Sequence, residues 1–209
     1  MKVLLVNGSP NKEGNTYKAL CEVAKTLNEE GIDTAFFQIG RAPISGCLAC
    51  GGCKTLGKCV IDDVVNDFLE IADKYDGFVF GSPVYYASAN GAMIAFMDRV
   101  FYADGNAGKK SFYLKPAASV MTARRAGTTA TFDQMNKYYT ISEMPIISSK
   151  YWNAVYRSPY DDKMDDEGYQ VMRTLGRNMA WFLKCKEAGE KAGVKMPKRE
   201  DKIATNFIN

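Results

Sequence analysis

The sequence predicts a doubly wound α/β fold, in which five parallel strands in the order 2-1-3-4-5 lie between two layers of helices. Three observations lead to this fold. Short apolar runs recur without alternating polar residues, as in strands covered on both faces, and the first is at residues 3–6. Segments with apolar residues three and four positions apart lie between these runs, which is helical periodicity. Turn-forming residues separate the two kinds of segment.

The first half of the chain supplies two strands and a helix before a loop. After strand 3–6, residues 17–30 have the spacing of a helix with one buried face, and Gly31 closes it. Residues 34–39 form the second strand. Residues 40–58 are rich in Gly and Cys and are expected to be a loop.

The middle of the chain continues the alternation. A helix is expected over residues 62–74, and Asp62 and Asp63 suit the positive end of its dipole. The apolar run 78–82 is the third strand, followed by a loop at 83–88 at its carboxyl end.

The last part of the chain completes the sheet. The adjacent Asp98 and Arg99 of the next helix are expected to be a structural ion pair or a surface charge pair. Residues 151–166 are an aromatic and acidic excursion before the final helix. The remaining elements are helix 90–101, strand 116–123, helix 130–141, strand 145–149 and helix 169–189.

The composition narrows the function. The chain is 46% hydrophobic and is most simply one domain, residues 1–190, with a basic tail, 191–209, that is either solvated or grips another subunit. Its net charge is only +3, so nucleic acid is not an expected partner. The apolar runs are too short for a membrane span, and Met1 leads directly into a strand, so we expect a cytoplasmic protein. There is no histidine, so catalysis should depend on a cofactor or cysteine.

The loop after the first strand suits a phosphate group. Unpaired N–H groups at a helix start carry partial positive charge, and Ser9, Asn15 and Thr16 add hydroxyl and amide groups there, with Asn15 as the expected N-cap. The loop lacks the glycine pattern of dinucleotide sites and the Gly-Lys-Ser/Thr ending of nucleoside-triphosphate sites, which favours a monophosphate. The alternative is an ordinary strand-to-helix connection.

The predicted topology brings three loops together. Ligands of such sheets bind outside the carboxyl ends of the strands where the strand order reverses, here between the first and third strands. Loops 9–15 and 83–88 flank this crevice, with Arg124 and Arg125 beside it, and such a site suits flavin mononucleotide (FMN). Tyr85 and Tyr86 alternatively serve as lid or dimer-contact aromatics.

Four cysteines lie close together in the loop that spans residues 46–59. Closely spaced thiolates among glycines can hold a [4Fe-4S] cluster. Free thiols, a zinc ion and regulatory disulfides remain alternatives, although zinc usually uses two separated cysteine pairs and disulfides are rare in the cytosol. Cys21 and Cys185 are expected to be core or surface thiols. The proposed metal ligands are Cys47, Cys50, Cys53 and Cys59.

With these features assembled, the chain resembles the iron–sulfur flavoprotein branch of the NAD(P)H-dependent FMN reductase family, whose fold is flavodoxin-like. The resemblance extends to about residue 190. The matching segments are Gly8-Ser9-Pro10, Gly14-Asn15-Thr16, the four-cysteine loop with Val60-Ile61-Asp62-Asp63, Gly81-Ser82-Pro83-Val84-Tyr85-Tyr86, Phe96-Met97-Asp98-Arg99, Ala123-Arg124-Arg125-Ala126-Gly127 and Tyr151-Trp152-Asn153.

The resemblance implies a set of cofactor-binding residues. It also implies a homodimer or homotetramer in which Trp152 lies near a neighbour's flavin. The phosphate is expected at Ser9, Asn11, Asn15 and Thr16, the isoalloxazine ring at Pro83, Val84, Tyr85 and Tyr86, and the pyrimidine side of the ring at the loop that contains Ala123, Arg124, Arg125 and Gly127.

These features predict an FMN-dependent NAD(P)H oxidoreductase. Hydride is expected to pass from NAD(P)H to FMN, and electrons then to a [4Fe-4S] cluster, a small-molecule acceptor or a redox protein. Arg124 or Arg125 is expected to stabilise the negative charge of the reduced flavin, and no side chain need act as acid or base. The alternatives are an FMN-only reductase of quinones, nitro compounds or azo dyes, a non-catalytic flavodoxin-type carrier, and a zinc-bound or redox-switched interaction protein without flavin.

Overall fold

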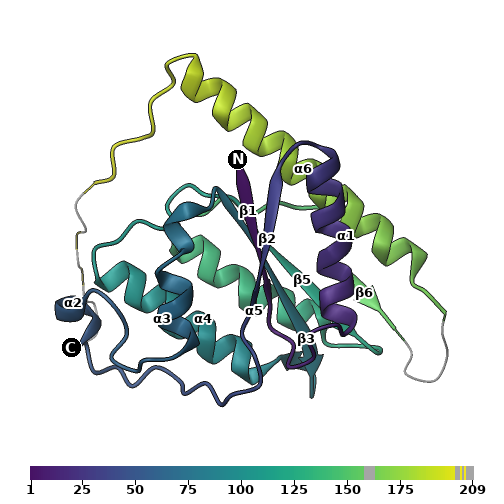
Figure 1. The fold of residues 1–209 in the computed structure, drawn as a ribbon, viewed down its shortest axis with the longest axis horizontal. Helices are drawn as coiled ribbons and strands as arrows, with labels where there is room; N and C mark the ends of the chain where they lie inside the picture. The colour runs from purple at the N-terminus through teal and green to yellow at the C-terminus, as the bar shows by residue number, and fades with distance from the viewer. Residues whose placement is uncertain (158–162, 201–202, 204, 206–209) are drawn as a thin grey trace.

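The computed structural model describes residues 1–157, 163–200, 203 and 205, and its centre is a twisted sheet of five parallel strands (Figure 1). In sheet order these strands are β2 (Asp33–Gln38), β1 (Lys2–Asn7), β3 (Gly77–Tyr85), β5 (Ala117–Ala123) and β6 (Ala154–Tyr156). Numbered along the chain, the parallel strands have the order 2-1-3-4-5, so the predicted fold is confirmed. A short strand, β4 (Ser88–Ala89), pairs antiparallel with the end of β3.

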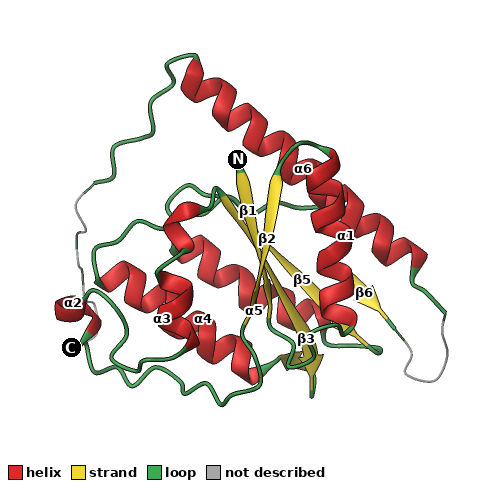
Figure 2. Ribbon diagram, viewed as in Figure 1, coloured by secondary structure: helices red, strands yellow, loops and turns green. Residues whose placement is uncertain are grey.

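Two layers of helices cover the sheet (Figure 2). The central strands β1, β3 and β5 are buried on both faces. Alternate residues point to opposite layers: Val3 and Leu5 pack with the α1 and α6 layer, while Leu4 and Val6 pack with the other. One layer is α1 (Asn15–Glu29) and α6 (Asp166–Lys191), and the other is α3 (Val64–Leu69), α4 (Gly91–Asn106) and α5 (Thr128–Ile141).

The prediction of the fifth strand at residues 145–149 is wrong. Ile146 makes only an isolated parallel bridge to Ala117 at the start of β5. The chain then turns away, with Tyr151 at a positive φ of 59°, and pairing resumes when Met121 N–H donates to the Asn153 carbonyl. The edge strand is therefore the three residues of β6.

Other element boundaries also differ from those expected. The helix predicted at 62–74 is two pieces, α3 and the short 3₁₀ helix η1 (Ala72–Lys74), and the cysteine loop contains one helical turn, α2 (Cys53–Leu56). Asp63 caps α3 as its charge suggests, accepting from the Val65 N–H at 3.1 Å. Asn15 is the first residue of α1 and not its cap; the cap position belongs to Gly14.

The described part of the tail returns along the protein's own body (Figure 1). The Arg199 guanidinium forms an ion pair with Glu143 and lies 5.5 Å from the Tyr113 ring centroid, so the tail packs on its own chain at this residue and is not fully solvated there. Lys202 and Phe207, also assigned to the tail, lie outside the described residues. Among the described helices, none has the length and apolar character that crossing a membrane requires.

Candidate functional site

A cleft of about 280 Å³ opens at the carboxyl ends of the strands, between the loop after β1 and the end of β3. This is the crevice that the topology predicts, at the point where strand order reverses. Nine of the twelve residues expected to hold the cofactor line it. Its lining residues are Ser9, Asn11, Gly14, Asn15, Thr16, Pro83, Val84, Tyr85, Thr122, Ala123, Arg124 and Arg157.

Side chains at the ends of neighbouring elements hold the loop after β1 in shape. The Asn7 amide, at the end of β1, donates to Gln38 Oε1 at 2.7 Å, and Gln38 donates to the Ser9 carbonyl at 2.6 Å. Asn90, the N-cap of α4, donates to the Gly8 carbonyl at 2.8 Å. The loop is thus bound to β2 and α4 as well as to β1.

Hydrogen-bond donors suited to an anion lie at the end of the cleft formed by the start of α1. Gly14 offers α1 no side-chain cap, so the first N–H groups of this helix have no partner in the helix or from a cap. Asn15 is exposed at this helix start, and Thr16 is buried beneath it with its hydroxyl 2.7 Å from that of Thr122. Amide, hydroxyl and backbone donors therefore face the same end of the cleft.

Replacing Gly8 with Ala is expected to destabilise the protein and distort this loop. A Cβ at position 8 would lie 2.7 Å from the Gly81 carbonyl oxygen and 2.9 Å from Met93 Sδ, and the backbone oxygen belongs to a central strand that cannot move freely. Overpacking of this kind costs about 1–3 kcal/mol. Urea unfolding of Gly8→Ala measures the loss. The matched control is Gly105→Ala on α4, where a Cβ meets no atom within 4 Å; equal losses in both variants would contradict this explanation.

A tight hairpin forms one wall of the cleft. Val84 and Tyr85 pair with Ala89 and Ser88, and the two residues of the turn, Tyr86 and Ala87, have positive φ, as hairpins of this length require. Pairing therefore continues through residues that were expected to form a loop, and Val84 and Tyr85 face the cleft.

Three of the twelve expected residues do not line the cleft. The Tyr86 side chain is fully exposed at the hairpin tip, and Arg125 is exposed next to Arg124. Gly127 instead allows close packing: with φ at 90°, a Cβ there would lie 2.7 Å from Val84 Cγ1 and 2.8 Å from the Ala87 carbonyl oxygen. Its role is to let the loop after β5 approach the hairpin.

The cleft also contains Gly14, Thr122 and Arg157, which were not among the expected cofactor-binding residues. Thr122 is near the end of β5, and Arg157 directly follows β6, where its N–H donates to the Ala123 carbonyl at 3.1 Å. Since residues that follow parallel strands lie at this edge of the sheet, a correct placement of the fifth strand would have indicated Arg157.

The four cysteines of the 46–59 loop line one small cavity. Cys47 and Cys50 are exposed, Cys53 is buried at the start of α2, and Cys59 is partly buried. Their donor set is four thiol sulfurs in a surrounding of Leu48, Val60 and Ile61, which suits an iron–sulfur cluster chemically. Within the described ranges, no three His, Cys, Asp or Glu side chains form a preformed site for a single metal ion.

Hydrogen bonds fix both the backbone and the sulfur of Cys59. The buried Asn66 accepts from the Cys59 N–H and donates to its carbonyl, both at 3.0 Å. The Arg99 guanidinium donates to the Cys59 sulfur from Nε and from Nη2, each at 3.3 Å. Burial would lower the pKa of Arg99, but its hydrogen bonds to Asp63 and Cys59 outweigh this and raise it, so Arg99 stays charged.

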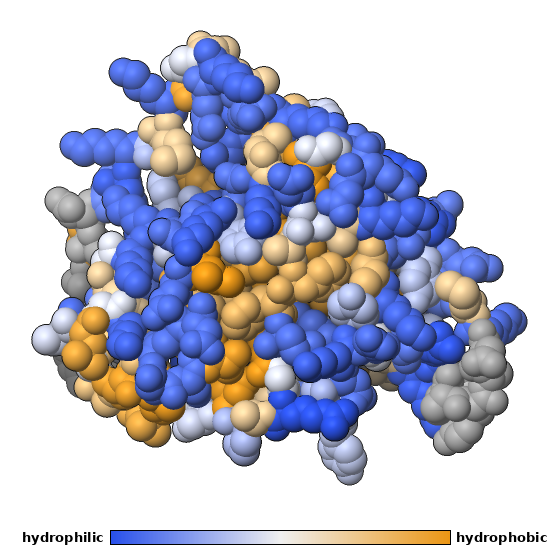
Figure 3. All heavy atoms as spheres, viewed as in Figure 1, coloured by the Kyte–Doolittle hydropathy of each residue, from blue (hydrophilic) through white to orange (hydrophobic). Residues whose placement is uncertain are grey.

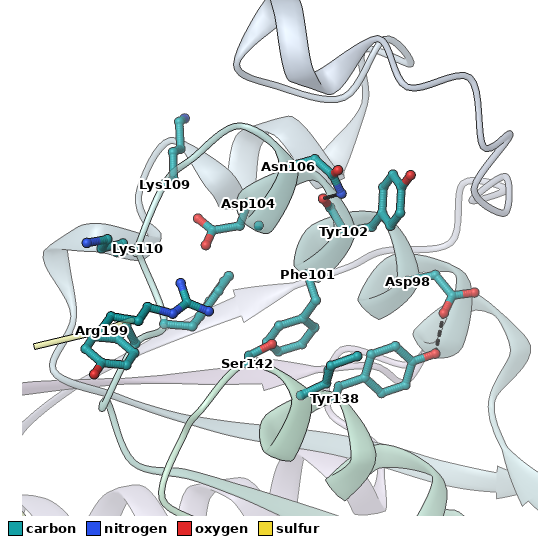
Figure 4. Close-up of a pocket in the computed structure, with 14 residues that line it drawn as sticks. Asp98, Phe101, Tyr102, Asp104, Asn106, Lys109, Lys110, Tyr138, Ser142 and Arg199 are labelled. Carbon is teal, nitrogen blue, oxygen red and sulfur yellow. Dashed lines mark hydrogen bonds between the residues drawn. The ribbon is translucent and has the colours of Figure 1, made fainter. Parts of the chain in front are cut away.

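Asp98 and Arg99 do not pair with each other. Arg99 pairs with Asp63 at 2.6 Å, whereas Asp98 accepts a short hydrogen bond from the Tyr138 hydroxyl (Figure 4). Adjacent residues of a helix point in different directions, which explains the separate partners. Burial and the bond to Asp98 together raise the pKa of the Tyr138 phenol well above its ordinary value.

A second cavity, of about 510 Å³, lies between α4, α5 and the tail, away from the cleft (Figure 4). Asp104 lines it, and one of its carboxylate oxygens is buried without a hydrogen-bond partner in the described structure. Burial raises the pKa of Asp104 above its ordinary value of 3.8, although contacts with Ser111 counteract this.

Asp104→Asn is therefore expected to stabilise the protein at neutral pH. The native carboxyl group binds its proton more tightly than the unfolded one, so wild-type stability falls as pH rises from 3.8 through the raised native pKa. Asparagine removes this loss. Thermal unfolding of both proteins from pH 3 to pH 8 checks it: the variant should unfold at a higher temperature near pH 7, and the difference should vanish at the acid end. A constant difference at every pH would contradict it.

The fold and the cleft together define a class of protein: a flavodoxin-like α/β protein with a polar cleft at the switch point of its sheet. Solved structures support the fold. The flavoenzyme NAD(P)H:(acceptor) oxidoreductase of Paracoccus denitrificans matches with a TM-score of 0.65 and 16% identity over 88% of this chain and 97% of its own. A flavodoxin from the domain Archaea matches with a TM-score of 0.60 and 14% identity over 88% and 99%.

Sequence comparison identifies the family within this class. The model of the NADPH-dependent FMN reductase family matches residues 1–157. An iron–sulfur flavoprotein of Methanocaldococcus jannaschii is 31% identical over 194 residues, which cover 88% of this chain and 98% of that protein. The chain belongs to the NADPH-dependent FMN reductase family, as its resemblance implies.

Proposed function

We propose that this protein is an FMN-dependent NAD(P)H oxidoreductase of the iron–sulfur flavoprotein type, which passes electrons from NAD(P)H through FMN to a [4Fe-4S] cluster or a small acceptor. One observation carries the proposal: nine residues expected to hold FMN, from three separate segments of the chain, line a single cleft. Family membership supports the cofactor, and the name of the M. jannaschii relative supports the cluster.

The cleft residues bind and orient the cofactor in this proposal. Asn15, Thr16 and the first N–H groups of α1 hold the phosphate, and the hairpin residues Val84 and Tyr85 lie along the ring. FMN supplies the hydride chemistry when bound, and the protein supplies position and charge. Arg124 lies on the cleft side of the loop after β5, where its positive charge stabilises an anionic ring.

Arg124→Ala is expected to slow the reduction of bound FMN by NADPH on the order of 10-fold or more, because a fixed charge that favours the product anion is lost. Anaerobic stopped-flow absorbance measures the rate. Arg177→Ala, on α6 in the helix layer formed by α1 and α6, is the matched control and should reduce at the wild-type rate. A larger loss in Arg125→Ala than in Arg124→Ala would contradict the role given to Arg124.

The cysteine loop is the proposed cluster site. Cys47, Cys50, Cys53 and Cys59 would each ligate the cluster, which supplies one-electron chemistry. Apolar surface gathers over this loop and α2, at the lower left of Figure 3, and includes the exposed Leu48 and Leu56. Such a surface suits contact with a redox protein or with another subunit, and we propose that electrons leave here.

Anaerobic mixing with NADH or NADPH tests the proposed function. The purified protein should be yellow-brown, contain FMN and iron, and lose its flavin absorbance after mixing with NADH or NADPH when no acceptor is present. An FMN-containing protein that only a separate reductase can bleach would be a carrier, and one with FMN but without iron would be an FMN-only reductase. A colourless protein that contains zinc would contradict the flavin proposal altogether.

A further inference from the structure

Arg99 is the most deeply buried charged side chain near the cysteine loop, with 1% of its surface exposed. It lies in the middle of α4, and within the residues that the structure describes its polar contacts are all with the segment 45–63. Besides its two bonds to Cys59, it donates to Asp63 Oδ2 at 2.6 Å and Oδ1 at 2.9 Å, to the Ile61 carbonyl at 2.9 Å and to the Ser45 carbonyl at 3.4 Å.

Packing alone does not account for an arginine at this position. Removing a guanidinium from water is costly, and an apolar side chain of similar size commonly stabilises a core as well or better. Apart from Asp104 near its end, the rest of the buried face of α4 is apolar and includes Phe96, Met97 and Val100. A positively charged side chain in this surrounding therefore indicates that the atoms it contacts need a positive charge nearby.

The sulfur of Cys59 is the contact that sets this arginine apart. Two N–H groups of one planar cation point at the same sulfur, which stabilises a thiolate more than a thiol. In the part of the chain that the structure describes, no such donor is recorded for the sulfurs of Cys47, Cys50 or Cys53. The four cysteines are thus electrostatically unequal.

We propose that Arg99 is a charge-tuning residue of the cysteine site, which raises the reduction potential of the cluster through its two hydrogen bonds to the Cys59 sulfur, with Asp63 limiting the effect. This inference rests on the cluster of the proposed function. Accepting one electron adds one negative charge to the cluster, so N–H donors aimed at a ligand sulfur stabilise the reduced state more than the oxidised state.

Asp63 acts as the opposing charge. Its carboxylate binds the far side of the same guanidinium through both oxygens and is partly exposed, with 24% of its side chain accessible. Neutralising Asp63 leaves the bonds from Arg99 to Cys59 in place and lets more of the positive charge act on the sulfur. Asn keeps the cap of α3, because Asn and Asp are equally good N-caps.

Arg99 and Asp63 carry opposite charges, so removing each one should shift the midpoint potential in an opposite direction. Arg99→Gln should lower the midpoint potential of the cluster, and Asp63→Asn should raise it. Each shift should reach about a tenfold change in the ratio of reduced to oxidised cluster at fixed potential, which is about 59 mV for one electron. The measurement is a reductive titration followed by electron paramagnetic resonance on anaerobically purified protein, with iron counted per chain.

A purely structural role predicts a different result. If Arg99 only anchored the loop, both variants would loosen it and shift the potential in the same direction. Arg173→Gln breaks a comparable ion pair, 2.6 Å to Glu22 between α6 and α1, and should leave the potential unchanged. Shifts of equal sign in Arg99→Gln and Asp63→Asn, or an unchanged potential in both, would overturn the inference.

The remaining outcomes are also decisive. If Arg99→Gln loses its iron, Asp63→Asn decides alone: a raised potential supports the role of Arg99, and an unchanged or lowered one overturns it. If the wild-type protein holds no iron even after anaerobic reconstitution, the proposed cluster itself is wrong and this inference fails with it. If the wild-type protein contains its full iron and neither variant shifts the midpoint potential, only the tuning role of Arg99 is overturned.

Discussion

Asn15→Asp is expected to weaken FMN binding about 100-fold without destabilising the fold. Asn15 is exposed at the start of α1, in the part of the cleft assigned to the phosphate. A carboxylate there repels the phosphate: two like charges about 4 Å apart near a protein surface interact by roughly 4 kcal/mol before salt screening, and each 1.4 kcal/mol or so is tenfold in affinity. Fluorescence titration of the apoprotein measures the affinity.

The Asn15→Asp substitution should lower the affinity for FMN without lowering the stability of the fold. An acidic residue in the first turn of a helix is favourable, by about 0.3–1 kcal/mol, so thermal stability should hold or rise slightly. Riboflavin is the matched control ligand, because it lacks the phosphate, and its affinity should barely change. Equal weakening of riboflavin and FMN would show that the phosphate does not lie at Asn15.

Cys47→Ala is expected to abolish the cluster while FMN stays bound. Cys47 is exposed in the loop, so removing its sulfur costs little packing, but it removes one of the four thiolates that would hold a cubane cluster. Iron and acid-labile sulfide should fall from about four each per chain to a small fraction of this. Both are measured on anaerobically purified protein together with the FMN content.

Cys185→Ala is the matched control, because Cys185 is also exposed but lies on α6, outside the loop. It should keep iron, sulfide and FMN at wild-type levels. If Cys47→Ala kept its full iron content, Cys47 would not be a ligand. If it lost FMN together with iron, the two sites would not be independent.

The sheet and most of the cleft followed from the sequence for a clear physical reason. Strands buried on both faces leave continuous apolar runs, and the order of parallel strands then determines which loops meet. Ser9 and Pro83 are 74 positions apart, yet both line the cleft, because β1 and β3 are neighbours in the sheet. No side-chain detail was needed for this part.

Features that depend on the direction of individual side chains could not be predicted from the sequence pattern. The short edge strand β6 has three residues, too few for a periodic signal, whereas the apolar run before it has the composition of a strand. Asp98 and Arg99 are adjacent in the sequence, but their true partners, Tyr138 and Asp63, are 40 and 36 residues away. Similarly, only the packing of Gly127 against the hairpin shows that it serves the backbone and does not face the cleft.

The central claim is that the cleft at the switch point of the sheet holds FMN. The most direct test is a crystal structure of the protein with FMN bound. The phosphate should lie against Asn15 and Thr16 at the start of α1, with the ring between the hairpin residue Tyr85 and the loop at Arg124. A phosphate bound elsewhere, or a cleft that stays filled by the protein's own side chains at saturating FMN, would contradict the claim.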